Sequence, residues 1–153
     1  MQVNTGEAIY LVDAKKLDLT DFWQVLIEIP QMIWYACGED LGIFYLLADC
    51  PSLCNVFDVQ IGVAYLTGNL QVGYSRAVSD VLGVALAKTE SQSDWLTRPL
   101  TKAQESYASD DVRYLLALHD GVCAALQARG LLTAAVEDSH TYAEAVSYTH
   151  LRA

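Results

Sequence analysis

Tyr107 and Asp111 lie four residues apart at the start of a long apolar stretch, and Asp58 ends an apolar run much earlier in the chain. Residues four apart share one face of a helix, so the phenol and the carboxylate can act together. Two carboxylates that converge can hold hard divalent cations, and a tyrosine beside them can position a water molecule. Residues of these types can catalyse the metal-assisted hydrolysis of a phosphodiester bond.

Both features also have an ordinary structural explanation. Spacing alone favours Tyr107 and Asp111 as a simple surface pair, since such pairs are common on helices. Asp58 stands between an expected strand and an expected helix, where residue preference favours a helix cap. The functional alternative places Asp58 at the carboxyl end of a strand in an open α/β sheet, the edge where ligands tend to bind.

Helical periodicity distinguishes Asp111 from its neighbour Asp110. On one continuous helix, six residues share an apolar face: Val112, Leu115, Leu116, Val122, Cys123 and Leu126. Asp110 then points away from this face into solvent, whereas Asp111 lies on its flank, beside Tyr107. The periodicity therefore predicts Asp111 as the site carboxylate.

The elements that must position these residues alternate in type along the first half of the chain. Short apolar segments predict strands at residues 8–13, 32–36 and 54–58, the first of them buried. Helices are expected between and after them, at residues 17–29, 38–47, 59–66 and 73–82. This alternation predicts an α/β fold with parallel strand pairing.

A single long helix is expected to carry Tyr107 and Asp111. Thr101 and Gln104 form a capping-box pattern at its start, and Gly130 fits its exit after about residue 128. The C-terminal half of the chain is therefore expected to be rich in helix.

Composition predicts one domain with a strongly acidic surface. The chain has 153 residues, of which 53% are hydrophobic and 18% charged, enough for a real core. Nineteen acidic residues against nine basic ones give a formal net charge of −10, which argues against a nucleic-acid binder with a basic patch. A metal-dependent nuclease must, however, concentrate carboxylates, and bound cations reverse the local field. Net acidity that only aids solubility is the alternative.

No zinc site, targeting signal or membrane span is evident. The four cysteines lack zinc-ligand spacing, so we expect reduced, mostly buried thiols: Cys37, Cys50, Cys54 and Cys123. No apolar run reaches the length of a bilayer span, and the first residues lack the basic segment of a signal peptide. We therefore expect a soluble cytoplasmic protein with no membrane partner.

Five short segments occur in a fixed order along the chain: Phe57–Ile61, Lys88–Ser91, Asp94–Leu96, Arg98–Leu100 and Tyr107–Val112. Together they resemble ribonuclease D and its relatives, the D-E-D-D-y group of 3'-5' exonucleases, over residues 2–138. The resemblance implies a ribonuclease-H-like exonuclease fold. It also implies hydrolysis of RNA from the 3' end, with tRNA precursors or other structured RNAs as substrates.

The same resemblance implies a catalytic centre of two divalent metal ions, Mg²⁺ or Mn²⁺, held by four carboxylates. Asp58 matches the aspartate of the second exonuclease motif, and Asp111 matches that of the third. Tyr107 matches the tyrosine that orients the attacking water. In this interpretation Asp58 and Asp111 are both catalytic residues and metal ligands.

Candidates for substrate contact are three basic residues and a tryptophan. Lys88, Arg98 and Arg113 could bind phosphates of the RNA, although solvated surface charge is the more frequent explanation. Trp95 could stack on a base, whereas a loop tryptophan more often anchors its own segment to the core.

Departures from the family pattern predict an incomplete site. The first exonuclease motif, Asp-x-Glu, is not found, and the sequence begins where the family is already in its third strand. Tyr35 stands where relatives usually have histidine, and Val59 where they have threonine. We therefore expect a fragment, truncated at both ends, whose sheet lacks its first strands and whose isolated chain is catalytically silent.

Residues 1–138 are expected to form the partial exonuclease domain, and residues 139–153 a tail. From Val146 onward the sequence resembles a translated sequencing-library adapter, so we expect residues 146–153 to be non-native and not to continue a helix. Two other functions stay open. One is a proofreading-type 3'-5' exonuclease acting on DNA, and the other is a degenerate, non-catalytic domain for nucleic-acid binding or scaffolding.

Overall fold

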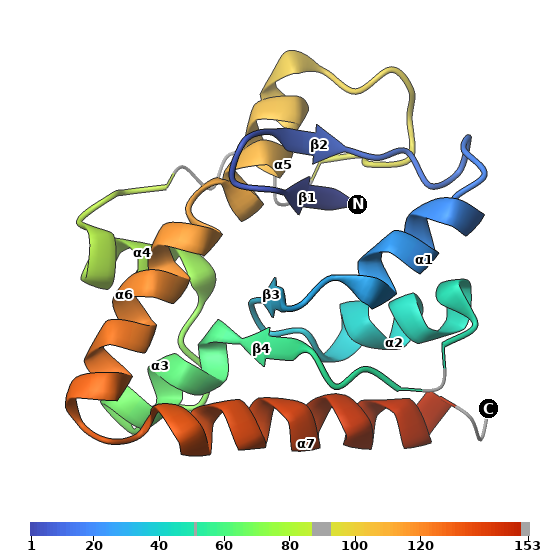
Figure 1. Cartoon of the computed structure of the whole chain (residues 1–153). Coiled ribbons are helices and arrows are strands. Elements are labelled where there is room, and N and C mark those ends of the chain that lie inside the picture. The colour runs from blue at the N-terminus through green and yellow to red at the C-terminus, as the bar shows by residue number, and fades with distance from the viewer. Residues whose placement is uncertain (51, 87–92, 151–153) are drawn as a thin grey trace.

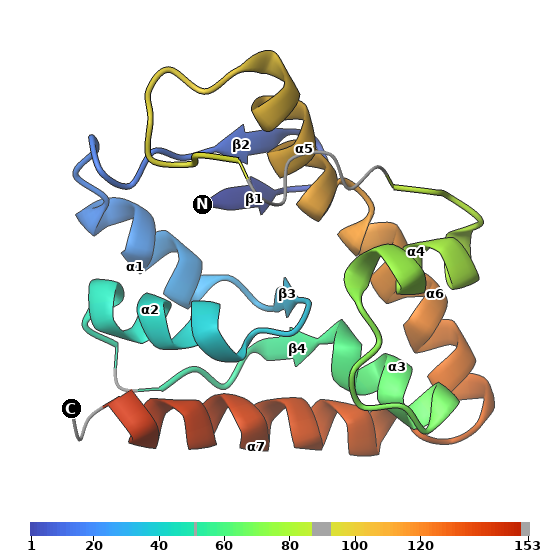
Figure 2. The same cartoon turned by 180° about the vertical axis from the view of Figure 1, so that it is seen from behind.

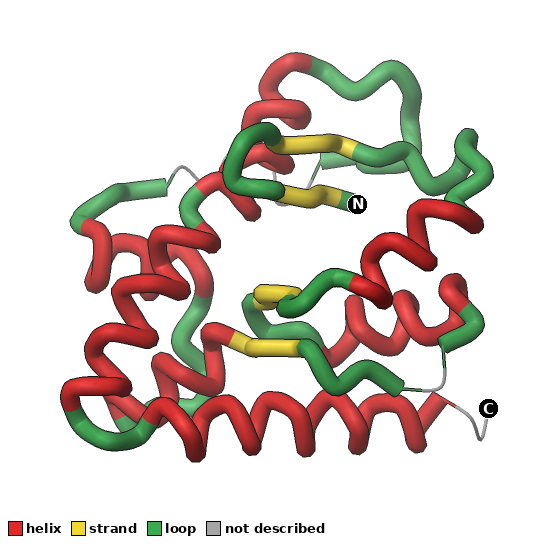
Figure 3. Tube along the Cα trace, in the orientation of Figure 1, coloured by secondary structure: helices red, strands yellow, loops and turns green. Residues whose placement is uncertain are grey.

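A computed structural model describes residues 1–50, 52–86 and 93–150 of the chain (Figure 1). Its elements follow in this order: β1 (Gln2–Asn4), β2 (Ile9–Leu11), α1 (Thr20–Glu28), β3 (Met32–Trp34), α2 (Gly38–Ala48), β4 (Val56–Asp58), α3 (Val59–Thr67), α4 (Tyr74–Leu82), α5 (Lys102–Arg113), α6 (Leu115–Ala128) and α7 (Leu132–His150). Figure 3 shows that helices dominate the second half, as expected. None of the helices in the described ranges is both long and apolar enough to cross a bilayer.

The strands form two separate two-stranded sheets. β1 and β2 pair antiparallel, with Gln2 opposite Leu11. β3 and β4 pair parallel, with Met32 opposite Val56, which confirms the predicted parallel pairing. Figures 1 and 2 both place β1 on the side of β2 that faces β3, but among the described residues the two sheets share no ladder.

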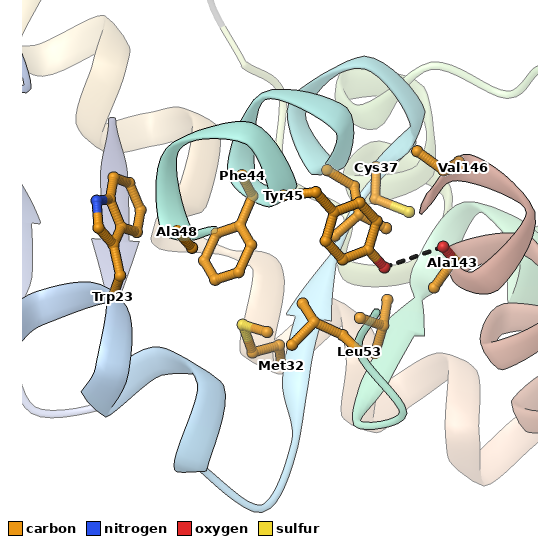
Figure 4. Close-up of a cluster of buried hydrophobic side chains, with 11 residues drawn as sticks. Trp23, Met32, Cys37, Phe44, Tyr45, Ala48, Leu53, Ala143 and Val146 are labelled. Carbon is orange, nitrogen blue, oxygen red and sulfur yellow. Dashed lines mark hydrogen bonds between the residues drawn. The ribbon is translucent and has the colours of Figure 1, made fainter. Parts of the chain in front are cut away.

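The β3–β4 sheet separates two hydrophobic cores. Successive side chains of a strand point to opposite faces, so Met32 and Val56 belong to one core while Ile33 and Phe57 belong to the other. The first core lies among α1, α2 and the C-terminal part of α7 (Figure 4). The second lies among α3, α4 and α6.

Aromatic packing and one buried hydrogen bond hold the first core together. The rings of Trp23 and Phe44 meet edge to face with centroids 5.3 Å apart. The Tyr45 hydroxyl donates to the Ala143 carbonyl at 2.9 Å, which joins α2 to α7 (Figure 4). A buried tyrosine hydroxyl needs such a partner, so this bond fixes where α7 lies against α2.

The second core depends on a close approach of α3 to α6. Gly62 faces α6, and a Cβ atom there would lie 2.8 Å from Val122 Cγ1 and 3.3 Å from Leu126 Cδ1. Val122 and Leu126 are fully buried. Glycine is therefore required at position 62 for packing rather than for backbone conformation.

Several predicted helix boundaries are confirmed. The Thr101 hydroxyl accepts from the Gln104 N–H, and the Gln104 side chain accepts from the Thr101 N–H, so the capping box is formed. α3 ends at Gly68, whose φ of 73° is left-handed backbone that glycine adopts without strain. Gly130 has a φ of 68° after α6.

The single long helix predicted from Thr101 to residue 128 is wrong. The chain breaks at Tyr114, with φ −99° and ψ 0°, into α5 and α6. The Asn4 side-chain amide donates to the Val112 carbonyl at 2.9 Å, so an acceptor at the end of α5 is taken by β1. The break is therefore accompanied by a contact from a distant strand, which local periodicity does not reveal.

Two further expectations differ from the structure. The predicted strand at 8–13 is shortened to β2 and is not buried, since Tyr10 is 54% exposed and, within the described residues, β2 pairs with β1 alone. Residues 146–150 do continue a helix: α7 runs through the proposed boundary at residue 138 to His150. Val146 and Ser147 are buried, which explains why the helix is retained there. The origin of residues 146–153 stays a prediction.

Candidate active site

A hollow of about 310 Å³ gathers the candidate residues of α5. It is lined by Tyr107, Asp110 and Asp111 from α5, with Gly73, Tyr74, Ser75 and Leu86 from the segment around α4. The structure therefore brings the predicted Tyr107 and Asp111 together. It does not include Asp58 in the lining of this hollow.

α5 is held at both ends, which fixes where its acidic residues lie. At its start, buried Gln104 completes the capping box and also donates to the Asp94 carbonyl at 3.0 Å. At its end, Asn4 donates to the Val112 carbonyl. α5 is thus tied to the preceding loop at its start and to β1 at its end, and the hollow lies beside α5.

Tyr107 is half-buried, and its ring packs against Trp95. The ring centroids are 5.9 Å apart with planes tilted by 48°. The Trp95 carbonyl also accepts from Arg98 at 2.8 Å. These contacts favour the interpretation in which Trp95 anchors its own loop, here against the catalytic candidate itself.

Asp110 and Asp111 both line the hollow, so the prediction that Asp110 points away from the site into solvent is wrong. Asp110 is partly buried and accepts from Arg113 Nε at 2.8 Å, whereas Asp111 is exposed as a whole residue. The prediction assumed one continuous helix, and the break at Tyr114 means that the apolar face of α6 cannot be extrapolated into α5. On α5 itself the buried residues are Gln104 and Ala108.

The carboxyl group of Asp111 has a raised pKa. Partial loss of solvation in the hollow is the larger cause, and the negative charge of Asp110 is the second. Tyr74, which also lines the hollow, has its pKa raised to about 12. Burial is the largest cause; a hydrogen bond with the Tyr114 backbone lowers the pKa, and the charges of Asp111 and Asp110 raise it. The hollow is therefore an acidic site in which a bound cation would relieve repulsion.

Asp58 caps α3, as residue preference predicts. The side chain is almost fully buried, and its oxygens accept from the backbone N–H groups of Ala36, Cys37 and Gln60, each at 2.9 Å. Asp58 also lies at the carboxyl end of β4, in the parallel pair, as the functional alternative requires. The capping role is thus shown, and the two explanations are compatible.

Two tyrosines lie between Asp58 and the hollow. The rings of Tyr35 and Tyr74 meet edge to face with centroids 5.3 Å apart, and Tyr74 lines the hollow. The Tyr35 hydroxyl donates to the Val72 carbonyl at 2.7 Å. Burial raises the pKa of Tyr35, and the charge of Asp58 raises it further. Tyr35, which departs from the family pattern, therefore packs against Tyr74 but does not itself line the hollow.

The two arginine candidates are engaged in ion pairs within the protein. Arg98 donates to both oxygens of Asp13, at 2.8 and 3.3 Å, and to the carbonyls of Trp95 and Thr97. Arg113 pairs with Asp110. Lys88 lies outside the described residues. Arg98 thus stabilises its own loop. This role differs from both explanations considered from the sequence, phosphate binding and solvated surface charge.

Three residues that shape the site were not anticipated from the sequence. Ser139, fully buried on α7, accepts the backbone N–H of Asp58 at 3.2 Å. Asn4 binds a carbonyl at the end of α5, and Tyr74 lines the hollow. No local motif marks any of them, since each acts through a contact distant in sequence.

The described residues form no cluster of metal ligands. Among the described residues, no group of three or more His, Cys, Asp or Glu side chains is placed to hold a metal ion. The two carboxylates of the hollow are adjacent residues of α5, and Asp58 is outside its lining. As arranged here, the residues do not fit a two-metal site.

Comparison with known proteins places the chain in a family. A family model described as 3'-5' exonuclease matches residues 1–126. A ribonuclease D of Pseudomonas paraeruginosa is 38% identical over 117 residues, covering 75% of this chain and 31% of that protein. The Escherichia coli ribonuclease D is 33% identical over 143 residues, covering 90% of this chain and 37% of that protein. The chain thus spans about a third of the length of these relatives.

Solved structures agree on the fold. The crystal structure of E. coli RNase D, described as an exoribonuclease involved in structured RNA processing, matches with a TM-score of 0.87 and 30% identity, over 95% of this chain and 39% of that one. The catalytic core of RRP6 from Trypanosoma brucei matches with a TM-score of 0.78 at 22% identity, which supports the fold alone, over 94% of this chain and 40% of that one. The predicted ribonuclease-H-like fold and the resemblance to ribonuclease D are confirmed, and the chain belongs to the 3'-5' exonuclease family.

Proposed function

We propose that this chain is part of a 3'-5' exoribonuclease of the ribonuclease D type, which trims the 3' ends of RNA such as tRNA precursors in the cytoplasm. The observation that carries the proposal is the shared hollow of Tyr107 and Asp111 in a chain whose relatives are named ribonuclease D. Similarity to an exoribonuclease involved in structured RNA processing supports RNA as the substrate.

In this proposal the complete protein uses two divalent cations, Mg²⁺ or Mn²⁺. Cations of this kind lower the pKa of a bound water and stabilise a leaving oxygen. Asp111 would contribute one carboxylate, because it lines the hollow together with Tyr107. Asp58 would contribute another, from a side chain whose position three backbone N–H groups already fix.

Tyr107 would position the attacking water in the complete site. A phenol hydroxyl can both donate and accept a hydrogen bond, so it can hold a water in one orientation. Packing against Trp95 restricts the ring of Tyr107, which favours such a positioning role. Arg98 and Arg113 stay candidates for phosphate contact only if their present carboxylate partners are exchanged for the substrate. Lys88, outside the described residues, also stays a candidate.

The chain by itself is proposed to be catalytically silent. Its described residues offer no group of three metal ligands, so the charge developed in a phosphodiester transition state is not compensated. This observation also favours the second candidate function, a non-catalytic domain that binds nucleic acid or acts as a scaffold. A purified chain that released 3' nucleotides from RNA with Mg²⁺ or Mn²⁺ would refute the proposed silence.

A chimera tests the proposed function directly. Residues 2–126 of this chain would replace the matching part of E. coli ribonuclease D, and release of 3' nucleotides would be followed on matched RNA and DNA oligonucleotides. We expect metal-dependent degradation of RNA, faster than of DNA, and its loss in the Asp111→Asn chimera. A folded, monodisperse chimera without hydrolysis would support the non-catalytic domain, and a preference for DNA would support a proofreading-type enzyme.

A further inference from the structure

The outward side of α2 carries an apolar stripe. Ile43, Leu46 and Leu47 are 55%, 77% and 51% exposed. They follow the spacing of neighbours on one helix face, three and four residues apart. Glu39 and Asp40 are exposed one turn earlier on the same side. We call these five residues the α2 outer face.

The opposite side of α2 is equally apolar, and it is buried. Leu41, Phe44 and Tyr45 belong to the first core, and Figure 4 shows the rings of Phe44 and Tyr45 within it. A helix that is apolar all round is normally covered all round. α1 and α7 flank α2 in Figures 1 and 2 but leave its outer face exposed. Single exposed apolar side chains are common on protein surfaces, whereas a contiguous group such as this one indicates an interaction surface.

Charge indicates what could cover this face. The sequence has no Lys or Arg between Lys16 and Arg76, nor between Arg129 and Arg152. The charged residues of α1, α2 and α7 apart from histidine are therefore all acidic: Asp21, Glu28, Glu39, Asp40, Glu137, Asp138 and Glu144. Such a surface repels nucleic acid and anionic membranes and attracts basic groups.

A second copy of the chain does not suit this face. In an antiparallel contact between two α2 helices, Glu39 and Asp40 of one copy would approach exposed Asp49 of the other. Like charges at a contact disfavour association, and each copy carries a net charge of −10. The occupant that fits has an apolar stripe and positive charge.

We propose that the α2 outer face docks a helical segment of another protein, with a leucine-type apolar stripe followed by lysine or arginine in its last turn. Packed antiparallel, that last turn lies beside Glu39 and Asp40, where its basic residues pair with carboxylates and also suit the helix dipole. The surface is independent of the hollow beside α5. None of its five residues lines that hollow.

A defined peptide tests the proposal on the full chain. The probe is a fluorescent helical peptide of about 15 residues with leucines at i, i+3, i+4 and i+7 and lysines in its last turn, read by fluorescence polarisation. Leu46→Gln is expected to weaken binding about tenfold, since it removes the most exposed contact of the stripe. Leu70→Gln is the matched control, because Leu70 is 78% exposed on the loop between α3 and α4.

A charge variant and a charge-reversed probe complete the test. Glu39→Gln with Asp40→Asn is expected to weaken binding several-fold and to flatten its dependence on salt. The same peptide with glutamates for lysines should bind far more weakly. The proposal would be overturned by any of three results. Leu46→Gln could bind the lysine peptide as tightly as the parent chain does, the glutamate peptide could bind as tightly as the lysine peptide, or the parent chain could show no saturable binding. A dimer in sedimentation that Leu46→Gln dissociates would instead assign the face to a second copy.

Discussion

At the scale of single residues, Asp58 has a structural role that is separate from any catalytic one. Its buried carboxylate accepts three backbone N–H groups, one at the start of α3 and two from the segment between β3 and α2. Asp111 makes no comparable set of bonds in the part of the chain that the structure describes, and it is exposed. The two aspartates of the proposed site should therefore differ sharply in what they contribute to folding.

Asp58→Ala should lower the free energy of unfolding by about 3 kcal/mol, because three N–H donors lose a charged acceptor in or near the core. Asp111→Ala should change it by no more than about 0.5 kcal/mol, as is usual for exposed positions. Urea unfolding followed by tryptophan fluorescence measures both. Equal destabilisation by the two substitutions would contradict the assigned role of Asp58.

The pKa of Asp111 should fall when the neighbouring charge is removed. Asp110→Asn eliminates the second cause of the raised pKa, and the titration of the Asp111 carboxyl carbon by NMR reports the change. Asp80→Asn removes a carboxylate paired with Arg76 on α4 and serves as the control, with no expected effect. An unchanged pKa in Asp110→Asn would leave loss of solvation as the sole cause.

The sign of the linked stability follows from the direction of this shift. A raised pKa means that the folded chain binds the Asp111 proton more tightly than the unfolded chain does. Stability from this group is therefore fully present below the ordinary aspartate pKa and is lost as the pH rises through the raised value. Asp111→Asn should remove this part of the pH dependence of unfolding in that window.

At the scale of elements, the break between α5 and α6 decides how the acidic residues are presented. The capping box at Thr101 and the exit at Gly130 were predictable, because caps are local in sequence. The break at Tyr114 was not, since a side chain of β1 binds the end of α5. Because of this break, the apolar face of α6 did not predict that Asp110 as well as Asp111 lines the hollow.

Contact between α3 and α6 should be sensitive to a single methyl group at Gly62. Gly62→Ala places a Cβ within 2.8 Å of Val122 Cγ1, and we expect a net loss of about 1 kcal/mol of stability, since overpacking outweighs the gain in helix propensity. Chemical denaturation of a double-mutant cycle with Val122→Ala measures it. The double mutant should lose less free energy of unfolding than the two single mutants lose together. Strictly additive losses would rule out the contact.

At the scale of the whole molecule, α7 joins the two cores. It begins beside the second core, where Ala135 is buried, and ends in the first, where Ala143 and Val146 are buried. Ser139 at its centre holds the backbone of Asp58. The proposed domain boundary at residue 138 therefore falls within an element on which the candidate site depends.

A chain ending at residue 138 should be less stable than the full chain by at least about 2 kcal/mol, because it loses buried apolar contacts of α7 and the Tyr45 partner at Ala143. A chain ending at residue 150 retains α7 and is the control. Urea midpoints of the three chains provide the comparison. Equal midpoints for the chains ending at 138 and 150 would support residues 139–153 as a dispensable tail.

The sequence by itself determined the fold class, most helix boundaries and the order of the family motifs. Those features are local: caps, glycine exits and the alternation of strand and helix depend on residues within one or two turns of each other. Only the tertiary structure decided that Tyr107 and Asp111 share a hollow with Asp110 and Tyr74, and that Asp58 does not line it. Convergence of side chains depends on contacts between distant segments, such as Asn4 with α5 and Ser139 with Asp58, and these leave no periodic signal in the sequence.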